Sequence, residues 1–218
     1  MPIAGELYFM YATMLIAVPT GVKVFNWITT MYRGSLTFET PMLFSIAFVI
    51  LFTFGGFTGM MLSIAAADIQ YHDTYFVVAH FHYVMVAGAV FSGTAAVYYW
   101  LPKWCGKMYD ETMGKLQFWI AFIGFNITFM PQHFLGLAGM PRRYADYGLQ
   151  FADWNMVSSI GAFMYGGAQL LFLYNVVRTI GWGKPTDDPQ VWEDAVGLEW
   201  TVPTPAPYHT FEKPPVVK

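Results

Sequence analysis

Residues 74–102 read TYFVVAHFHYVMVAGAVFSGTAAVYYWLP and contain no Asp, Glu, Lys or Arg. A helix of this length exceeds the ~20 residues that are needed to cross the hydrocarbon core of a bilayer. The apolar residues run continuously and do not alternate with polar ones, which excludes a strand of a membrane barrel. The stretch therefore predicts one transmembrane helix.

Four other stretches have the same character. Three of them also lack Asp, Glu, Lys and Arg, and the fourth is interrupted only by Lys23. They are residues 7–32, 40–67, 116–140 and 154–177. Of the 218 residues, 56% are hydrophobic and only 11% are charged, which is too few for the surface of a soluble protein. We therefore expect an all-α membrane protein with five transmembrane helices.

Most of the basic residues that flank these helices fall on one side of the membrane. They are Arg33, Lys103, Lys107, Lys115, Arg178 and Lys184. The positive-inside rule makes this side cytoplasmic and places the N-terminus outside and the C-terminus inside. Residues 1–182 would form the transmembrane part, and the proline-rich residues 183–218 would form a cytoplasmic tail.

Composition also excludes several functions. A net charge of −3 gives no indication that the chain binds nucleic acid. The single cysteine, Cys105, excludes an internal disulfide, a cysteine-based zinc site and an iron–sulfur cluster. The first apolar stretch lacks the basic segment and cleavage site of a secretory signal. An outer start without a signal leads us to expect further helices upstream of this sequence.

Two histidines in the quoted stretch, His80 and His82, are the strongest chemical feature of the sequence. At about 100° per residue, side chains two positions apart on a helix point to nearly opposite faces. One metal ion cannot take both rings, but two metal centres on opposite sides can. Neutral imidazole is a common axial ligand of haem iron, so the spacing favours a helix between two haems with Phe81 between the ligands. The alternative is two histidines hydrogen-bonded to neighbouring helices.

Four further polar residues form two candidate sites. His72 and Asp73 precede the histidine helix at the outer surface, where a nitrogen and a carboxylate could help to bind a hard divalent ion. The alternative is a simple helix N-cap.

Lys23 lies near the middle of its span, where burial would favour the neutral amine, and Thr20 is on the same face. We interpret this pair as part of a proton path, and the alternative is a lysine that reaches the membrane surface.

Arg142 and Arg143 follow the fourth helix on the outer side, against the positive-inside bias. Paired guanidinium groups at this place imply an acidic partner, and haem propionates would fit. Asp68, in the neighbouring outer loop, would share this network. The alternative partners are Asp146 and lipid phosphate.

Two other features are interpreted as structural. Gly55 and Gly59 have the spacing of small residues at a close contact between helices. His133 lies in the outer part of the fourth helix and is interpreted as a structural residue.

Several long segments together resemble subunit I of the haem–copper terminal oxidases of the cytochrome c oxidase type. The resemblance extends over nearly the whole chain in order and implies the last five helices of a twelve-helix subunit. The segments that carry it are Val18–Phe25, His72–Tyr75, Val78–Tyr83, Pro131–Leu137, Gly139–Tyr144 and Pro207–Phe211.

The resemblance implies roles for the residues around the histidine pair. His80 would be the proximal ligand of the high-spin, oxygen-reducing haem, and His82 one axial ligand of the low-spin haem. Phe81 would lie between the two haems. His72 and Asp73 would bind a structural magnesium ion.

The resemblance also implies roles for the other polar residues. Arg142 and Arg143 would hold the haem propionates, with Asp68 in the same network. Lys23 and Thr20 would line the lysine proton pathway. The haems would be of the a type, and Asp73 followed by threonine favours cytochrome c over quinol as the electron donor.

The remaining parts of such an enzyme are implied outside this sequence. The histidine ligands of the active-site copper would belong to an upstream part of subunit I, so the present chain alone is expected to be inactive. A subunit II with a binuclear copper site, a subunit III and cytochrome c would be partners, in the plasma membrane of a bacterium. The alternatives are a quinol oxidase, a relative of the nitric oxide reductases, and a membrane scaffold or transporter without enzyme activity.

Overall fold

The computed structural model describes residues 2–186, 188, 190–193, 195–211 and 213–215. Five helical spans are long and apolar enough to cross a membrane among these residues, which confirms the predicted number. The spans are Ile3–Met31, Thr40–Ser63, Tyr75–Cys105, Glu111–Leu137 and Leu149–Trp182.

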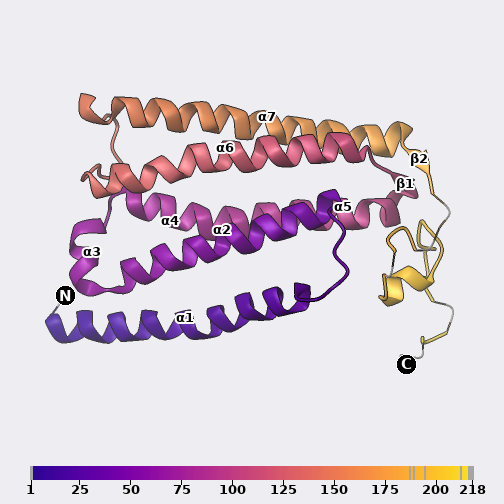
Figure 1. The fold of residues 1–218 in the computed structure, drawn as a ribbon, viewed down its shortest axis with the longest axis horizontal. Coiled ribbons are helices and arrows are strands. Elements are labelled where there is room, and N and C mark those ends of the chain that lie inside the picture. The colour runs from indigo at the N-terminus through magenta and orange to yellow at the C-terminus, as the bar shows by residue number, and fades with distance from the viewer. Residues whose placement is uncertain (1, 187, 189, 194, 212, 216–218) are drawn as a thin grey trace.

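The spans form an antiparallel bundle (Figure 1). Helix α1 (Ile3–Met31) lies at one edge beside α2 (Thr40–Ser63), and α6 (Glu111–Leu137) pairs along its length with α7 (Ala152–Trp182). The two chain termini lie at opposite ends of the bundle, as an odd number of spans requires. We call these ends the histidine end, which holds His72, and the tail end, which holds the residues after α7.

The third span combines three helical segments. Helix α4 (Tyr75–Met85) continues through a π-helical segment, η1 (Val86–Phe91), into α5 (Ser92–Cys105). A π-helical turn adds one residue to the helical repeat and therefore rotates the side chains that follow it. In this chain the turn begins four positions after His82.

The connection between α2 and α4 is more ordered than the loop that the sequence predicts. Ile64 adopts an extended conformation with ψ of 112°, which ends α2. The chain then forms the short helix α3 (Ala65–Tyr71), which carries Asp68. Three consecutive alanines, the residues with the highest helix propensity, explain why a helix resumes there.

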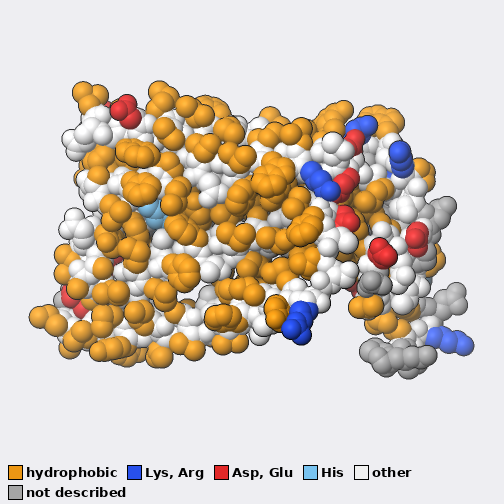
Figure 2. All heavy atoms as spheres, in the orientation of Figure 1, with side chains coloured by type: hydrophobic (Ala, Val, Ile, Leu, Met, Phe, Trp, Pro, Cys, Tyr) orange, Lys and Arg blue, Asp and Glu red, His pale blue; other side chains and the backbone are white. Residues whose placement is uncertain are grey.

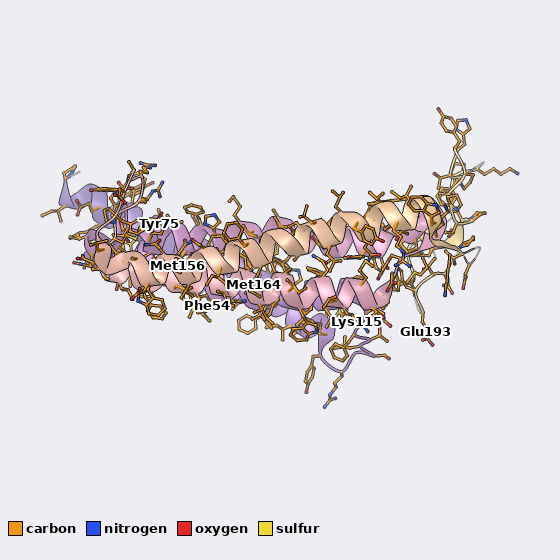
Figure 3. The ribbon with its side chains drawn as sticks, turned by 90° about the horizontal axis from the view of Figure 1, so that it is seen from above. Phe54, Tyr75, Lys115, Met156, Met164 and Glu193 are labelled. Carbon is orange, nitrogen blue, oxygen red and sulfur yellow. The ribbon has the colours of Figure 1, made fainter. Side chains whose placement is uncertain are left out.

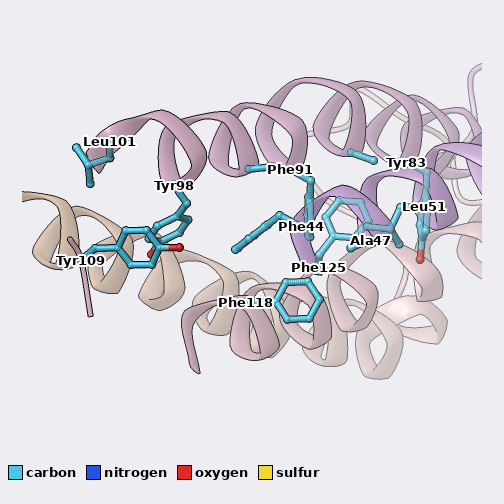
Figure 4. Packing of buried hydrophobic residues seen from close by; sticks show 12 residues of the cluster. Phe44, Ala47, Leu51, Tyr83, Phe91, Tyr98, Leu101, Tyr109, Phe118 and Phe125 are labelled. Carbon is cyan, nitrogen blue, oxygen red and sulfur yellow. The ribbon is translucent and has the colours of Figure 1, made fainter. Parts of the chain in front are cut away.

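Aromatic side chains fill the interior between α2, α5 and α6. Phe44, Phe91, Phe118 and Phe125 are each at most 5% exposed and pack edge to face or tilted against one another (Figure 4). Tyr98 joins the same cluster toward the tail end. Such rings bury large apolar areas in fixed geometries, so they hold the three helices in register.

Most of the outer surface is hydrophobic. In the face shown by Figure 2 apolar side chains cover the spans, and the visible Lys and Arg side chains gather toward the tail end. Within the described part of α1, no residue is buried. An apolar surface of this extent fits lipid or further membrane helices.

The residues after α7 return to the tail end of the bundle. Strand β2 (Lys184–Pro185) pairs with β1 (Lys107–Met108), and the 3-10 helix η3 (Leu198–Thr201) carries Trp200, which is 3% exposed. The Lys103 ammonium donates to the carbonyl oxygen of Val202 at 2.6 Å. Several described residues of this segment, among them Trp192, Val202 and Thr204, are hydrogen-bonded to α5.

Asp110 caps the N-terminus of α6 at the same end. Its Oδ1 accepts a hydrogen bond from the Met113 amide at 3.0 Å, and its Oδ2 lies 3.1 Å from Arg178 on α7. The Met113 N–H and, after it, the Arg178 guanidinium lower the pKa of the Asp110 carboxyl. The capped start of α6 is thereby tied to the end of α7.

Glycines allow α6 and α7 to approach closely. A Cβ atom on Gly161 would lie 2.5 Å from the backbone nitrogen of Thr128, and one on Gly124 would lie 2.8 Å from that of Tyr165. Ser158, on the same side of α7, donates to the Thr128 carbonyl at 2.6 Å. In a membrane, lipid is as apolar as a helix surface, so burial of apolar area does not drive helices together. Close packing at small residues and hydrogen bonds from hydroxyl groups join them instead.

We expect Gly161→Ala to destabilise the full-length protein by about 1–3 kcal/mol, because the added methyl group meets backbone atoms that cannot move independently. Gly166→Ala is the matched control, since a Cβ atom there has nothing within 4 Å. Thermal unfolding of both variants in detergent measures the difference. Equal melting temperatures would contradict the close contact of α6 with α7.

Candidate metal-ligand pair and outer polar cluster

Helix α4 places the histidine pair and is fixed at its first turn. Thr74 is the N-cap, with its hydroxyl oxygen accepting from the Phe76 amide at 3.2 Å. The Tyr75 amide donates to the Met140 carbonyl at 3.0 Å, which joins the start of α4 to the loop after α6. Figure 3 shows Tyr75 near one end of the bundle, opposite the end that holds Lys115 and Glu193. His80 and His82 follow within two turns of this fixed start.

The His80 ring faces α2. Its Nδ1 lies 2.9 Å from the Gly55 carbonyl oxygen and 3.1 Å from the Thr58 hydroxyl. A Cβ atom on Gly59 would lie 2.8 Å from Cε1 of the ring, so only glycine leaves space for the imidazole. The carbonyl requires a proton on Nδ1, which leaves Nε2 as the nitrogen with a free lone pair. Gly55 and Gly59 thus form the close helix contact that the sequence predicts, and Gly59 makes it with a candidate ligand.

The His82 ring faces α6. It stacks on Phe129 with ring centroids 4.1 Å apart and an interplanar angle of 15°. Its Nδ1 lies 2.7 Å from the Val78 carbonyl oxygen in its own helix, which again leaves Nε2 to act as a ligand. The two rings therefore contact different neighbouring helices, as their spacing predicts. His80 is hydrogen-bonded to a neighbouring helix, and His82 is hydrogen-bonded within its own helix.

Four charged or titratable residues form a connected cluster at the histidine end. His72 Nδ1 lies 3.7 Å from Asp68 Oδ2, and His72 Nε2 lies 3.5 Å from Asp73 Oδ2. The second carboxylate oxygen of Asp73 lies 3.7 Å from Nε of Arg142. The structure thus joins two predicted groups, the His72–Asp73 pair and the network of Asp68 with Arg142, into one cluster.

Backbone contacts hold this cluster beside the histidine helix. The Arg142 amide donates to the Asp73 carbonyl at 2.8 Å, and the backbones of Thr74 and Pro141 pair as an isolated antiparallel β-bridge. Asp73 and Arg143 both have positive φ, 53° and 65°, the left-handed conformation that turns each loop sharply. The Arg142 guanidinium lies 6.0 Å from the centre of the Phe81 ring. Arg142 therefore connects this cluster to Phe81, the residue between the two histidines.

The described residues alone do not form a complete metal site. They contain no group of three or more His, Cys, Asp or Glu side chains that could hold a metal ion. The two nitrogens of His72 face different carboxylates, so this cluster offers a divalent ion few ligands on any one side. A magnesium ion bound here would need further oxygen ligands from elsewhere.

Lys23 and Thr20 lie together on α1, but the burial that the sequence suggests for Lys23 is not found within this chain. The Lys23 side chain is exposed, because among the described elements α1 packs mainly against α2, with a smaller contact to α3. Lys23 and Thr20 line a cavity of about 390 Å³, together with Pro19, Trp27 and Phe52. The Thr20 hydroxyl donates to the Ile16 carbonyl at 2.9 Å.

Some of these contacts are not predicted by the sequence analysis. Thr58 and Phe129, which contact the two histidine rings, were not identified from the sequence. Thr58 lies between Gly55 and Gly59 on one helix face, so this spacing was the available signal. His133 is 5% exposed and packs edge to face on Phe54 and Phe76, in keeping with a structural role.

The fold and the site together define a multi-pass membrane protein with a histidine pair on an internal helix. The sequence model of the family described as "Cytochrome C and Quinol oxidase polypeptide I" matches residues 1–164. The chain belongs to this family, which confirms the resemblance found in its sequence.

Two curated relatives agree with this assignment. The chain is 54% identical to cytochrome c oxidase subunit 1 of Cereibacter sphaeroides over 96% of its own length and 37% of the relative. It is 51% identical to cytochrome c oxidase subunit 1 of Bacillus sp. (strain PS3) over 100% of its length and 35% of the relative. The chain thus spans only about a third of the length of these relatives.

The fold has a counterpart among solved structures. A cryo-EM structure of a heme-copper terminal oxidase dimer superimposes with a TM-score of 0.75 over 97% of this chain and 41% of that one, at 17% sequence identity. This likeness supports the arrangement of the five spans. Membership of the family implies haem and copper as cofactors of the whole protein.

Proposed function

We propose that this chain is part of the catalytic subunit of a cytochrome c oxidase, which reduces oxygen to water with electrons from cytochrome c and translocates protons. The observation that carries the proposal is the placement of His80 and His82, whose rings face α2 and α6 and are hydrogen-bonded through Nδ1 to the described residues. The 54% identity to a cytochrome c oxidase subunit 1 supports the choice of reaction.

The residues around the two rings fit haem ligation. Each Nδ1 is held by a carbonyl oxygen, which fixes the ring and favours the tautomer that ligates through Nε2. His80 would ligate the high-spin haem and His82 the low-spin haem, both of the a type. When bound, the haems with copper supply the electron transfer and oxygen chemistry. The protein chain supplies ligands, orientation and proton access, and Phe81 separates the two ligands.

His82→Ala in the full-length oxidase tests the assignment of the two ligands. We expect it to abolish the low-spin haem signal in the reduced-minus-oxidised spectrum and to weaken the high-spin signal less, because His80 stays on the opposite face. His133→Ala is the matched control, since this ring packs among aromatic side chains on α2 and α4. Loss of both haem signals to the same extent, in a protein that still assembles, would contradict the assignment.

Thr58→Val tests the orientation of His80. A hydrogen bond contributes about 1 kcal/mol, so losing the Thr58 hydroxyl should leave the haem bound but alter the spectrum of the high-spin haem alone. Thr53→Val is the control, because the Thr53 hydroxyl bonds only within its own helix, to the Val49 carbonyl. An unchanged high-spin spectrum in Thr58→Val would show that this contact does not position the ligand.

The outer cluster would neutralise acidic groups of the cofactors. We propose that Arg142 and Arg143 bind haem propionates, with Asp68 in the same network, and that His72 and Asp73 contribute to a magnesium site completed by another chain. The Arg142–Asp73 contact and the position of Arg142 over Phe81 support this arrangement, since both place the guanidinium next to the helix of the two histidines.

The rest of the enzyme would supply what these residues do not. We propose that the active-site copper is held by an upstream part of subunit I, and that subunit II with a binuclear copper site and subunit III are partners. The complex would lie in the plasma membrane of a bacterium. Residues 1–182 would be its transmembrane part, with the N-terminus outside, and residues 183–218 a cytoplasmic tail. The basic residues at the tail end support this orientation.

Lys23 and Thr20 would carry protons toward the oxygen-reducing site. A lysine at the centre of a span costs at least roughly 2.5–3.5 kcal/mol, a cost that a proton-transfer role explains. We expect Lys23→Met to slow reduction of the haem–copper centre by roughly a hundredfold, within the range for a positioned proton-transfer group. Stopped-flow spectroscopy of the full-length enzyme measures this rate.

Lys115→Met is the matched control for this variant, because Lys115 is exposed beside Glu111 at the tail end. It should reduce at the parent rate. Normal kinetics in Lys23→Met, with both haem spectra intact, would remove Lys23 from the proton path.

A quinol oxidase is the second candidate, since the matching family description includes both donors. Turnover of the full-length enzyme with reduced cytochrome c and with a quinol, measured separately as oxygen uptake, distinguishes the two. Oxygen uptake with the quinol alone would overturn the choice of cytochrome c.

A further inference from the structure

Two cavities lie along the side of α1 that faces α2. The first, of about 390 Å³, contains Lys23 and Thr20. The second, of about 710 Å³, lies between α1, α2, α5 and the tail, and we call it the tail-end cavity. Its wall includes the polar side chains of Thr30, Ser35, Thr37, Glu39, Ser45, Ser92 and Glu193. The rest of the wall is mostly apolar, but these polar groups can hold water, which the first cavity would need as a source of protons.

Among the described residues, Trp27 alone lines both cavities. Its ring contacts Phe48 on α2 with centroids 4.8 Å apart, and Phe52 with centroids 6.1 Å apart. Phe48 lines the tail-end cavity and Phe52 lines the cavity of Lys23, and their own centroids are 5.7 Å apart. Three aromatic rings in mutual contact therefore stand at the boundary between the two cavities.

The sequence of α1 places this boundary on a polar stripe. Thr20, Lys23, Trp27 and Thr30 are spaced by three, four and three residues, so they lie on one face of the helix. Trp27 follows Lys23 by about one turn, or ~6 Å along the axis. The stripe would be polar throughout if Trp27 did not interrupt it.

We propose that Trp27, with Phe48 and Phe52, forms an aromatic gate that controls access from the tail-end cavity to Lys23. Apolar constrictions close a pathway by excluding water, without needing a charge or a rigid plug. A closed gate would keep Lys23 from exchanging protons continuously with the tail side. The inference rests on the proton-path role proposed above for Lys23, and it adds the place where that path is controlled.

Access to position 23 can be measured directly in the full-length oxidase. The experiment uses Lys23→Cys in a Cys105→Ser background and follows its modification by a small hydrophilic methanethiosulfonate reagent added from the tail side. We expect Trp27→Ala to raise the modification rate roughly tenfold or more, because removing the indole opens the constriction. Trp27→Phe should keep the parent rate. An unchanged rate in Trp27→Ala would overturn the gate.

Two further variants make the result specific. Trp100→Ala removes an indole from the wall of the tail-end cavity without touching the cavity of Lys23, and it should leave the rate unchanged. An equal increase in Trp100→Ala would also overturn the gate. If Trp27→Ala does not retain its haems, Phe48→Ala removes another ring of the same cluster and is interpreted in the same way.

The outcome is separable from that of the proton-path proposal. If Lys23→Met leaves reduction of the haem–copper centre unchanged, the role of Lys23 fails, whatever the labelling rates. If Lys23→Met slows reduction while Trp27→Ala leaves labelling unchanged, the path stands and the gate is wrong.

Discussion

Helix α4 can present two imidazoles to two different neighbours only because its backbone approaches both α2 and α6 closely. On the α2 side Gly55 and Gly59 supply the space, and the Gly55 carbonyl holds His80. On the α6 side Gly136 lies so close to Phe76 that a Cβ atom would overlap the backbone of α4. A larger residue at any of these glycines would separate the helices and move the rings. The geometry of the histidine pair therefore depends on glycines of the adjoining helices.

The same close approach of the helices explains why the cluster of Asp68, His72, Asp73 and Arg142 lies beside the histidine helix. Because α6 crosses the start of α4, the loop after α6 pairs with Asp73 and Thr74 through backbone contacts. The Arg142 guanidinium then lies near both the Asp73 carboxylate and the Phe81 ring. Arg142 thus has a defined structural neighbour on each of two sides. Any acidic group that approached the histidines from this end would meet a guanidinium already held in place by a carboxylate.

The sequence was sufficient for features with a regular repeat. The five spans follow from continuous apolar runs, and the divergence of His80 and His82 follows from the helical rotation per residue. It was insufficient where tertiary contacts decide the outcome. Thr58 and Phe129 are ordinary residues of apolar helices until α4 is placed between them. The sequence predicts a buried Lys23, but burial depends on helices on both sides of α1, and the described residues supply α2 and the short α3.

The surroundings of Lys23 also show how a titratable residue in a membrane span can have limited contact with water. A titratable amine in a span needs contact with water to change its protonation state, yet a permanent column of water would let protons pass freely. Threonines on the same helix face provide polar contacts, and the rings of Trp27, Phe48 and Phe52 lie where those contacts would otherwise be continuous. The aromatic residues stabilise the α1–α2 contact in the same position. Packing and control of access are therefore carried by one cluster, so a variant that loosens the packing there should also open the path.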